Sequence, residues 1–234
     1  MKLLITAFAL FLSVCSFGQP NLKVQTDEIG QVNAMENLLR ALSYTNSYEI
    51  KEADIEGIAY LDENFTDGAV VLTTGAKYSG IPLRYNVYNE QIEFKNLKGE
   101  VFNINNPSSI NELTIGSSKF IYVNFIHSNK DRHLFAEVLS EGKASLLKHH
   151  RLSLQPAKQA ETHRAAQPPK FVKIPSEYLI KKEDGNVQLI KSKKELLLML
   201  TDKSKEINEM ITKEKLSVKD ECDLTRIVNF YNRN

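Results

Sequence analysis

The spacing of hydrophobic positions changes along the chain and divides it into segments of different predicted structure. From Asp27 to Ser43, apolar residues recur every third or fourth position, which places them on one face of an α-helix. Asp27 is a suitable N-cap, whereas Gly30 weakens the helix, because glycine costs about 1 kcal/mol relative to alanine in a helix interior. We expect the helix to lie against the core through Ile29, Val32, Met35, Leu39 and Leu42.

After residue 68 the apolar spacing becomes two. Short runs rich in β-branched and aromatic residues alternate with turn signals such as Thr74-Gly75, Lys98-Gly99 and Glu141-Gly142. The runs are AVVLTT, KYSGI, LRYNVY, QIEFKN, EVFNIN, ELTIG, KFIYVNFI, HLFAEVLS and KASLLKHHRLSL. Because no helical segment lies between them, neighbouring runs are expected to pair antiparallel. The prediction is a β-meander that curls into a barrel-like or sandwich-like sheet.

One predicted hairpin, LRYNVYNEQIEF, contains the candidate binding residues. Its first strand alternates apolar and polar positions, and we expect Arg84, Asn86 and Tyr88 to face water from the polar side. A guanidinium, an amide and an aromatic ring in one row can stack on and hydrogen-bond a sugar or a base. The alternative is an ordinary solvated strand face. Asn89 suits a two-residue turn, but Glu90 does not suit its second position, so a longer loop stays open.

Residues 156–170, PAKQAETHRAAQPPK, contain three prolines and almost no large apolar side chain, which indicates a linker. The linker would separate residues 19–155, an N-terminal helix followed by an antiparallel β-domain, from residues 171–234. The latter segment is predicted to begin with a β-hairpin that turns at Asp184-Gly185-Asn186.

The last 43 residues have the spacing of helices. One helix is expected to begin at Ser192, with Glu195 at the capping-box position. A second has apolar residues on one face, and a third begins near Ser217 and Asp220, with Cys222 on its buried side. We expect a small helical cap, so the predicted fold class is α+β.

The first 18 residues have the layout of a secretory signal peptide, with Lys2, an apolar run and a small-residue end. The run is shorter than the roughly 20 residues that cross a bilayer. Cleavage after Gly18 predicts an exported protein, periplasmic or secreted. Cys15 leaves lipoprotein anchoring open as an alternative, although Val14 is larger than the residue that usually precedes a lipidated cysteine. No second long apolar run follows, so no transmembrane segment is expected in the mature chain.

Composition and charge narrow the function classes. A content of 42% hydrophobic and 25% charged residues is that of an ordinary globular protein. Loss of Lys2 with the leader takes the formal charge from +1 to about zero, which does not favour a nucleic-acid partner. Cys222 is then the only thiol, so no intramolecular disulfide can form.

Motifs for catalysis and for cofactors are not found. The chain has no GxSxG elbow and no GxxxxGK phosphate loop, and a zinc site would need about four ligands. His127 and His133 flank one turn, whereas the adjacent His149 and His150 are expected to face opposite sides of a strand. No catalytic residue, metal ligand or cofactor is therefore assigned, and the histidines are expected to be solvated or to make cross-strand contacts.

The segments AYLDENFTDGAVVLTTGAKYSGIPLRYNVYNEQIEFK and LLLMLTDKSKEINEMITKEKLSVKDECDLTRIVNFYN support a family resemblance. With their acidic YLDE start, PLRYNVYN followed by EF, and a lysine-rich tail ending FYN, they resemble a group of exported, functionally uncharacterised proteins of Bacteroidetes-type bacteria. The resemblance implies export from a gram-negative cell and a β-plus-helical build. It implies no catalytic residues.

Two functions remain open. The first is a non-catalytic binding or assembly module of the cell envelope, with a protein, a glycan or an outer-membrane component as its partner. The second is an envelope hydrolase whose carboxylates and histidines meet only in the fold. A deep pocket would favour the hydrolase if it were lined by several of His127, His133, Asp62, Glu63 and Glu93.

Overall fold

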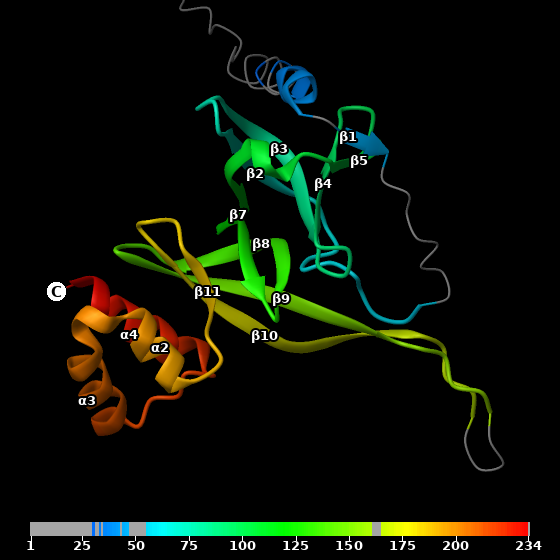
Figure 1. Ribbon diagram of the computed structural model, residues 1–234. Helices are drawn as coiled ribbons and strands as arrows, with labels where there is room; N and C mark the ends of the chain where they lie inside the picture. The colour runs from blue at the N-terminus through cyan, green and yellow to red at the C-terminus, as the bar shows by residue number, and fades with distance from the viewer. Residues whose placement is uncertain are drawn as a thin grey trace, which may run out of the picture.

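The computed structural model describes residues 30, 33, 35–42, 44–46, 55–160 and 165–233. They form one 11-stranded antiparallel sheet, which is not closed, with helices at both ends of the chain (Figure 1). The predicted α+β class is confirmed. The predicted leader, Cys15 and Asp27 lie outside the described residues.

The strands are β1 (Tyr44–Asn46), β2 (Thr66–Leu72), β3 (Lys77–Asn86), β4 (Gln91–Lys95), β5 (Val101–Ile104), β6 (Ile110–Ile115), β7 (Ser118–His127), β8 (Lys130–Ser140), β9 (Ala144–Gln155), β10 (Lys170–Lys182) and β11 (Val187–Leu189). The C-terminal helices are α2 (Lys193–Met199), α3 (Ser204–Glu214) and α4 (Glu221–Arg233), and short 3-10 turns cover Pro107–Ser109 and Thr201–Lys203.

The strand order is β1-β5-β4-β3-β2-β6-β7-β8-β9-β10-β11, which departs from a simple meander at two places, where β1 pairs with β5 and where β6 pairs with β2. Strand β6 pairs with β2 instead of with β5, so two runs of hairpins are joined along the β2–β6 edge. Gly68 lies in β2 at this junction, where the register with β3 shifts. A Cβ atom at Gly68 would lie 2.1 Å from the carbonyl oxygen of Thr114, so only glycine permits this approach.

The N-terminal helix covers the first run of strands. Its described part includes residues 35–41, and Met35, Leu38 and Leu42 are buried in the same apolar cluster as β2–β6. The predicted packing face is therefore confirmed at Met35 and Leu42. Leu38 is fully buried whereas the predicted Leu39 is only partly so.

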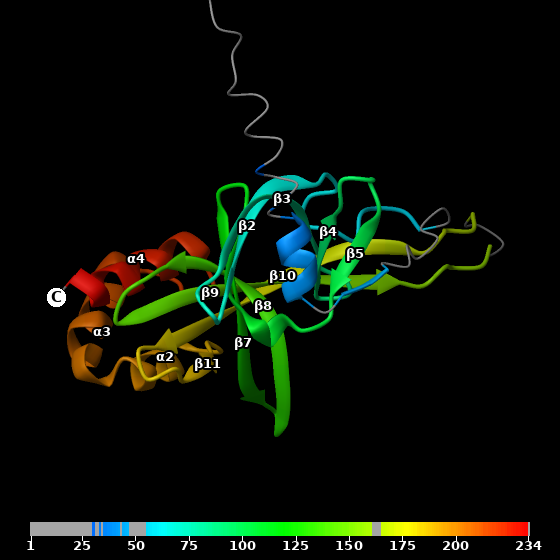
Figure 2. The same cartoon turned by 90° about the horizontal axis from the view of Figure 1, so that it is seen from above.

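Strands β9 and β10 form a long ribbon that extends beyond the rest of the sheet (Figure 2). Their pairing runs from Gln155 opposite Lys170 to Ala144 opposite Lys182. The segment predicted as a linker, 156–170, therefore connects two paired strands, and backbone hydrogen bonds between Lys158 and Gln167 continue the ribbon. The same sheet proceeds through β10 into β11.

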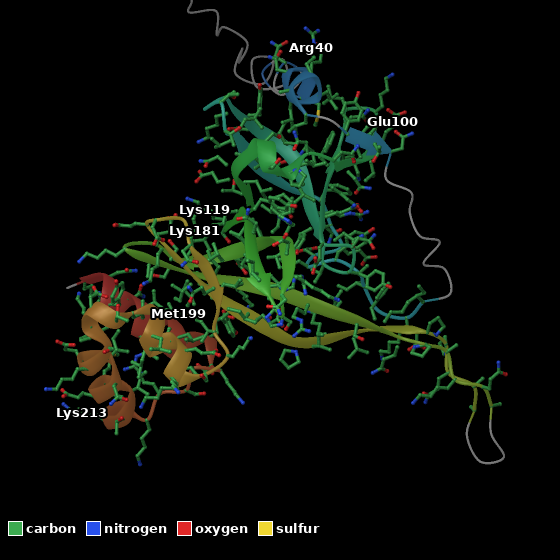
Figure 3. All side chains as sticks on the ribbon, viewed as in Figure 1. Arg40, Glu100, Lys119, Lys181, Met199 and Lys213 are labelled. Atoms are coloured by element: carbon green, nitrogen blue, oxygen red, sulfur yellow. The ribbon has the colours of Figure 1, made fainter. Side chains whose placement is uncertain are left out.

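The C-terminal helices pack on the β8–β10 part of the sheet as a separate apolar cluster. Figure 3 shows Met199 inside this group and Lys213 on its outer side. The Ser192 hydroxyl accepts from the Glu195 N–H at 3.2 Å, as predicted, while the Glu195 carboxylate accepts from the Lys191 N–H at 3.0 Å. No helix in the described part of the chain is long and apolar enough to cross a membrane.

The prediction that Cys222 is buried was wrong. Helix α4 begins at Glu221, and the carboxylate of Asp220 caps it by accepting from the Asp223 N–H at 3.0 Å. Cys222 lies in the first turn, more than half a turn away from the buried Leu224, and is exposed.

Candidate functional site

The row predicted to face water, Arg84, Asn86 and Tyr88, is covered. Arg84 is 8% exposed and Asn86 4%, while the half-buried Tyr88 packs on Phe171 with 4.9 Å between ring centroids. The prediction of an exposed row was therefore wrong. The alternation of apolar and polar residues shows which side chains share one side of a strand. It does not reveal that residues 55–65 fold over the polar side.

Arg84 is held by contacts within the protein. Its guanidinium lies 2.7 Å from the carboxylate of Glu93, which is directly opposite on β4. It also donates to the hydroxyl of Tyr60 at 2.9 Å and to the backbone oxygen of Glu63 at 3.2 Å. The rings of Tyr60 and Phe65 lie 3.7 and 4.4 Å from its central carbon. Arg84 thus fixes the covering segment to the sheet.

The four-residue loop after β3 resolves the alternative left open for that turn. Strand β3 ends at Asn86 and β4 begins at Gln91, so the loop is longer than two residues. Positive φ occurs at Glu90 (55°) and not at Asn89. The loop carries the Glu90 side chain to β9, where it contacts His149 at 3.0 Å.

A pocket of about 460 Å³ lies between the covering segment and the β9–β10 ribbon. Its wall includes a β-bulge, because the register of β10 against β9 shifts between Ile174 and Glu177. Pro175 has no N–H to donate to a ladder, which suits this interruption, and bulges often re-aim side chains next to functional sites. The lining residues are Tyr60, Leu61, Val87, Lys148, His150, Arg151, Leu152, Lys173, Ile174, Pro175 and Ser176.

Basic side chains dominate the charge of this pocket, and none of the described residues that line it is acidic. Lys148 pairs with Glu221 at 2.6 Å, and Arg151 pairs with Glu177 at 3.0 Å. These two partners hold their cations in place from outside the lining. Lys173 is exposed and forms no ion pair with any described residue. It is therefore available to an anion.

The helical cap positions one lining residue, Lys148, through Glu221, which itself lies outside the lining. The same carboxylate that pairs with Lys148 accepts a hydrogen bond from the hydroxyl of Tyr178 at 3.1 Å. Burial and the negative charge of Glu221 raise the pKa of Tyr178 to about 12, so the phenol stays a neutral donor. The position of Lys148 consequently depends on both β10 and α4.

His150 is oriented by a carboxylate. Its Nε2 lies 2.7 Å from Oε2 of Glu137, and Ser118 donates to the other oxygen of Glu137 at 2.6 Å. The hydrogen bond with His150 lowers the pKa of Glu137 more than burial raises it, with a smaller contribution from Ser118. The serine hydroxyl contacts the carboxylate and not the imidazole, so it lacks the base that a serine nucleophile needs.

His149 lies on the opposite side of β9 from His150, as predicted. Its ring is 2% exposed and lies between two carboxylates, 3.0 Å from Glu90 and 3.3 Å from Glu177. Burial raises the pKa of Glu90, but the hydrogen bond with His149 and the charges of Arg132 and Arg151 outweigh it, so the pKa is lowered. This buried group joins the β3–β4 loop to β9 and β10 outside the pocket.

The candidate residues for a hydrolase do not meet. The pocket beside the bulge contains none of them, and two other cavities contain one each, His133 and Asp62. The ring of His133 stacks near Tyr122 with centroids 6.3 Å apart. No group of three His, Cys, Asp or Glu side chains among the described residues is placed to hold a metal ion. The five candidates were His127, His133, Asp62, Glu63 and Glu93.

The pocket residues were missed because they come from distant segments. A partial signal was present in β9, where Lys148 and His150 alternate onto one side of the strand. Nothing local indicates that Lys173 and Glu221 lie beside them. Comparisons of the chain with protein-family models, with curated proteins and with solved structures give no match.

Proposed function

We propose that this chain is an exported binding protein of the cell envelope and that the pocket beside the β10 bulge binds an acidic glycan. The observation that supports this best is the lining of the pocket, which contains Lys148, His150, Arg151 and the unpaired Lys173 and no described acidic residue. The predicted leader and the family resemblance support export.

The chemistry of the lining matches such a ligand. Ammonium and guanidinium groups form charge-assisted hydrogen bonds with carboxylates and phosphates, and these bonds are stronger than neutral ones. The aliphatic part of the lining, including Leu61, Leu152 and Ile174, suits the less polar face of a sugar ring. A volume of about 460 Å³ lies within the usual range for small-ligand sites. A mono- or disaccharide with a carboxylate or phosphate group fits these properties.

The alternative function, a hydrolase, is favoured by one observation. His150 lines the pocket and is oriented by Glu137, the relation that a general base needs. However, its Nε2 is occupied by Glu137, and no nucleophile among the described residues contacts its ring. Binding therefore accounts for more of the pocket than catalysis does.

Calorimetric titration with glucuronate, galacturonate disaccharide and glucose 6-phosphate tests the proposal, with glucose as the neutral control. Lys173→Ala should weaken binding of the acidic sugars by about tenfold or more, because it removes a charge-assisted hydrogen bond. Lys181→Ala, at the other end of β10, is the matched control and should change nothing. The proposal is wrong if no acidic sugar binds or if the two variants behave alike.

The same samples separate binding from hydrolysis. A binding protein returns the disaccharide intact after long incubation. Release of monosaccharide that is abolished by His150→Ala would replace the binding function with the hydrolase.

A further inference from the structure

Helix α3 separates two surface grooves of similar volume, about 690 Å³ and 720 Å³. Both belong to the helical cap, outside the proposed binding pocket. Successive residues of an α-helix lie 100° apart around its axis, and the buried Ile207 and Ile211 of α3 face the core. Lys205 and Glu206 lie on the exposed side, one towards each flank. Asn208 borders both grooves.

The groove between α2 and α3, called the basic groove below, combines an apolar floor with a positively charged rim. Leu198 is 63% exposed and Leu197 is partly buried beside it. Lys193, Lys194 and Lys205 line the groove, and no described acidic residue does. None of these three lysines forms an ion pair within the described chain.

The groove on the other flank of α3, called the acidic groove below, has the opposite charge. Glu206, Glu209 and Glu214 line it together with one lysine, Lys213, and its apolar surface comes from Met210 and Phe230. Glu214 is paired with Arg226, whereas Glu206 and Glu209 form no ion pair with described residues. The exposed carboxylates of Glu206 and Glu209 are thus available for contacts with another molecule.

We propose that the basic groove receives the acidic groove of a second copy of this chain. Two grooves of similar size, opposite charge and apolar floor on one helix provide complementary surfaces on every copy. Exposed apolar residues rimmed by charge are typical of protein contacts. Copies in which each groove meets a different neighbour add head to tail into a ring or a chain, whereas a two-fold pair of copies that uses both grooves at once closes as a dimer. The inference goes beyond the proposed glycan binding and does not depend on it.

The first test measures mass against concentration by light scattering and sedimentation, using the chain without its predicted leader. The wild type should form a two-fold dimer or larger head-to-tail species as concentration rises. Lys194→Glu/Lys205→Glu and Glu206→Lys/Glu209→Lys should each weaken assembly by about tenfold or more, because like charges then face one another. All four positions are exposed and Lys and Glu have similar helix propensity, so circular dichroism should show folded variants.

Mixing the two variants provides the decisive control. The first variant has two acidic grooves and the second has two basic grooves, so each is monomeric alone and the equimolar mixture assembles. Restoration in the mixture supports contact between the basic groove of one copy and the acidic groove of another. A wild type that stays monomeric up to about 1 mM overturns the proposal, as does assembly that both variants retain or a mixture that stays monomeric. Binding of monomeric wild type to anionic vesicles would instead assign the basic groove to a lipid surface.

Discussion

At the residue scale, a buried ion pair occupies the polar side of the β3–β4 hairpin. Arg84 and Glu93 are cross-strand neighbours, and their side chains are 9% and 3% exposed. Taking two charges out of water is costly, and the cost is offset only while both partners and their hydrogen bonds are present. A row that resembles a ligand platform in the sequence is therefore part of the internal structure.

Removal of one partner should expose this cost. Arg84→Met is expected to lower the free energy of unfolding by about 3–5 kcal/mol, because Glu93 is left buried without its cation. Urea unfolding followed by circular dichroism measures the change. Lys77→Met, at the exposed start of β3, is the control and should stay within about 0.5 kcal/mol. The double variant Arg84→Met/Glu93→Leu should regain part of the loss; an Arg84→Met cost similar to that of the control would contradict the buried pair.

At the element scale, local signals located most strands and helices. The turn at Asp184-Gly185-Asn186, the cap at Ser192 and the long strand containing His149 were all predicted and are present. Caps and turns are determined by residues only a few positions apart, so their signals can be read from a single sequence. Cys222 was misplaced because residues two positions apart lie about 200° apart around a helix, so it cannot share the buried side of Leu224.

The cap of α4 can be tested by itself. Asp220→Ala should lower the free energy of unfolding by about 1 kcal/mol, because the N–H of Asp223 loses its acceptor. Ser217→Ala is the matched comparison, since its hydroxyl accepts only from the Lys219 N–H outside the helix. Thermal and urea unfolding of both variants should rank Asp220→Ala as the more harmful; the reverse order would place the cap at Ser217.

At the scale of the whole molecule, carboxylates connect segments that are far apart in the chain. Glu90 binds His149 across 59 positions of sequence, and Glu137 binds both Ser118 and His150. Their pKa values are lowered in the folded state by these contacts acting against burial. The stabilising contribution of each carboxylate is present above its ordinary pKa of 4.5 and is lost as the pH falls through the lower folded value.

Unfolding measured across acid pH should show this connection. The wild type is expected to lose stability as the pH falls from 5 towards about 3, since the unfolded chain binds more protons there. Glu137→Gln should cost on the order of 1–3 kcal/mol at pH 7 and should flatten the acid slope. Glu112→Gln is the control, because Glu112 pairs with Lys119 at a partly exposed site. An unchanged slope in Glu137→Gln would show that this carboxylate is not linked to folding.

The sequence by itself determined the α+β class, the antiparallel strands, the Ser192 cap and the opposite placement of His149 and His150, because each depends on neighbours within a turn or a strand pair. Tertiary structure alone decided that β6 joins β2, that residues 55–65 cover Arg84, and that Lys148 and Lys173 line one pocket, with Glu221 of α4 paired to Lys148. These contacts join residues tens of positions apart. Which distant segments meet depends on how the whole apolar surface is buried, and local periodicity does not contain that information.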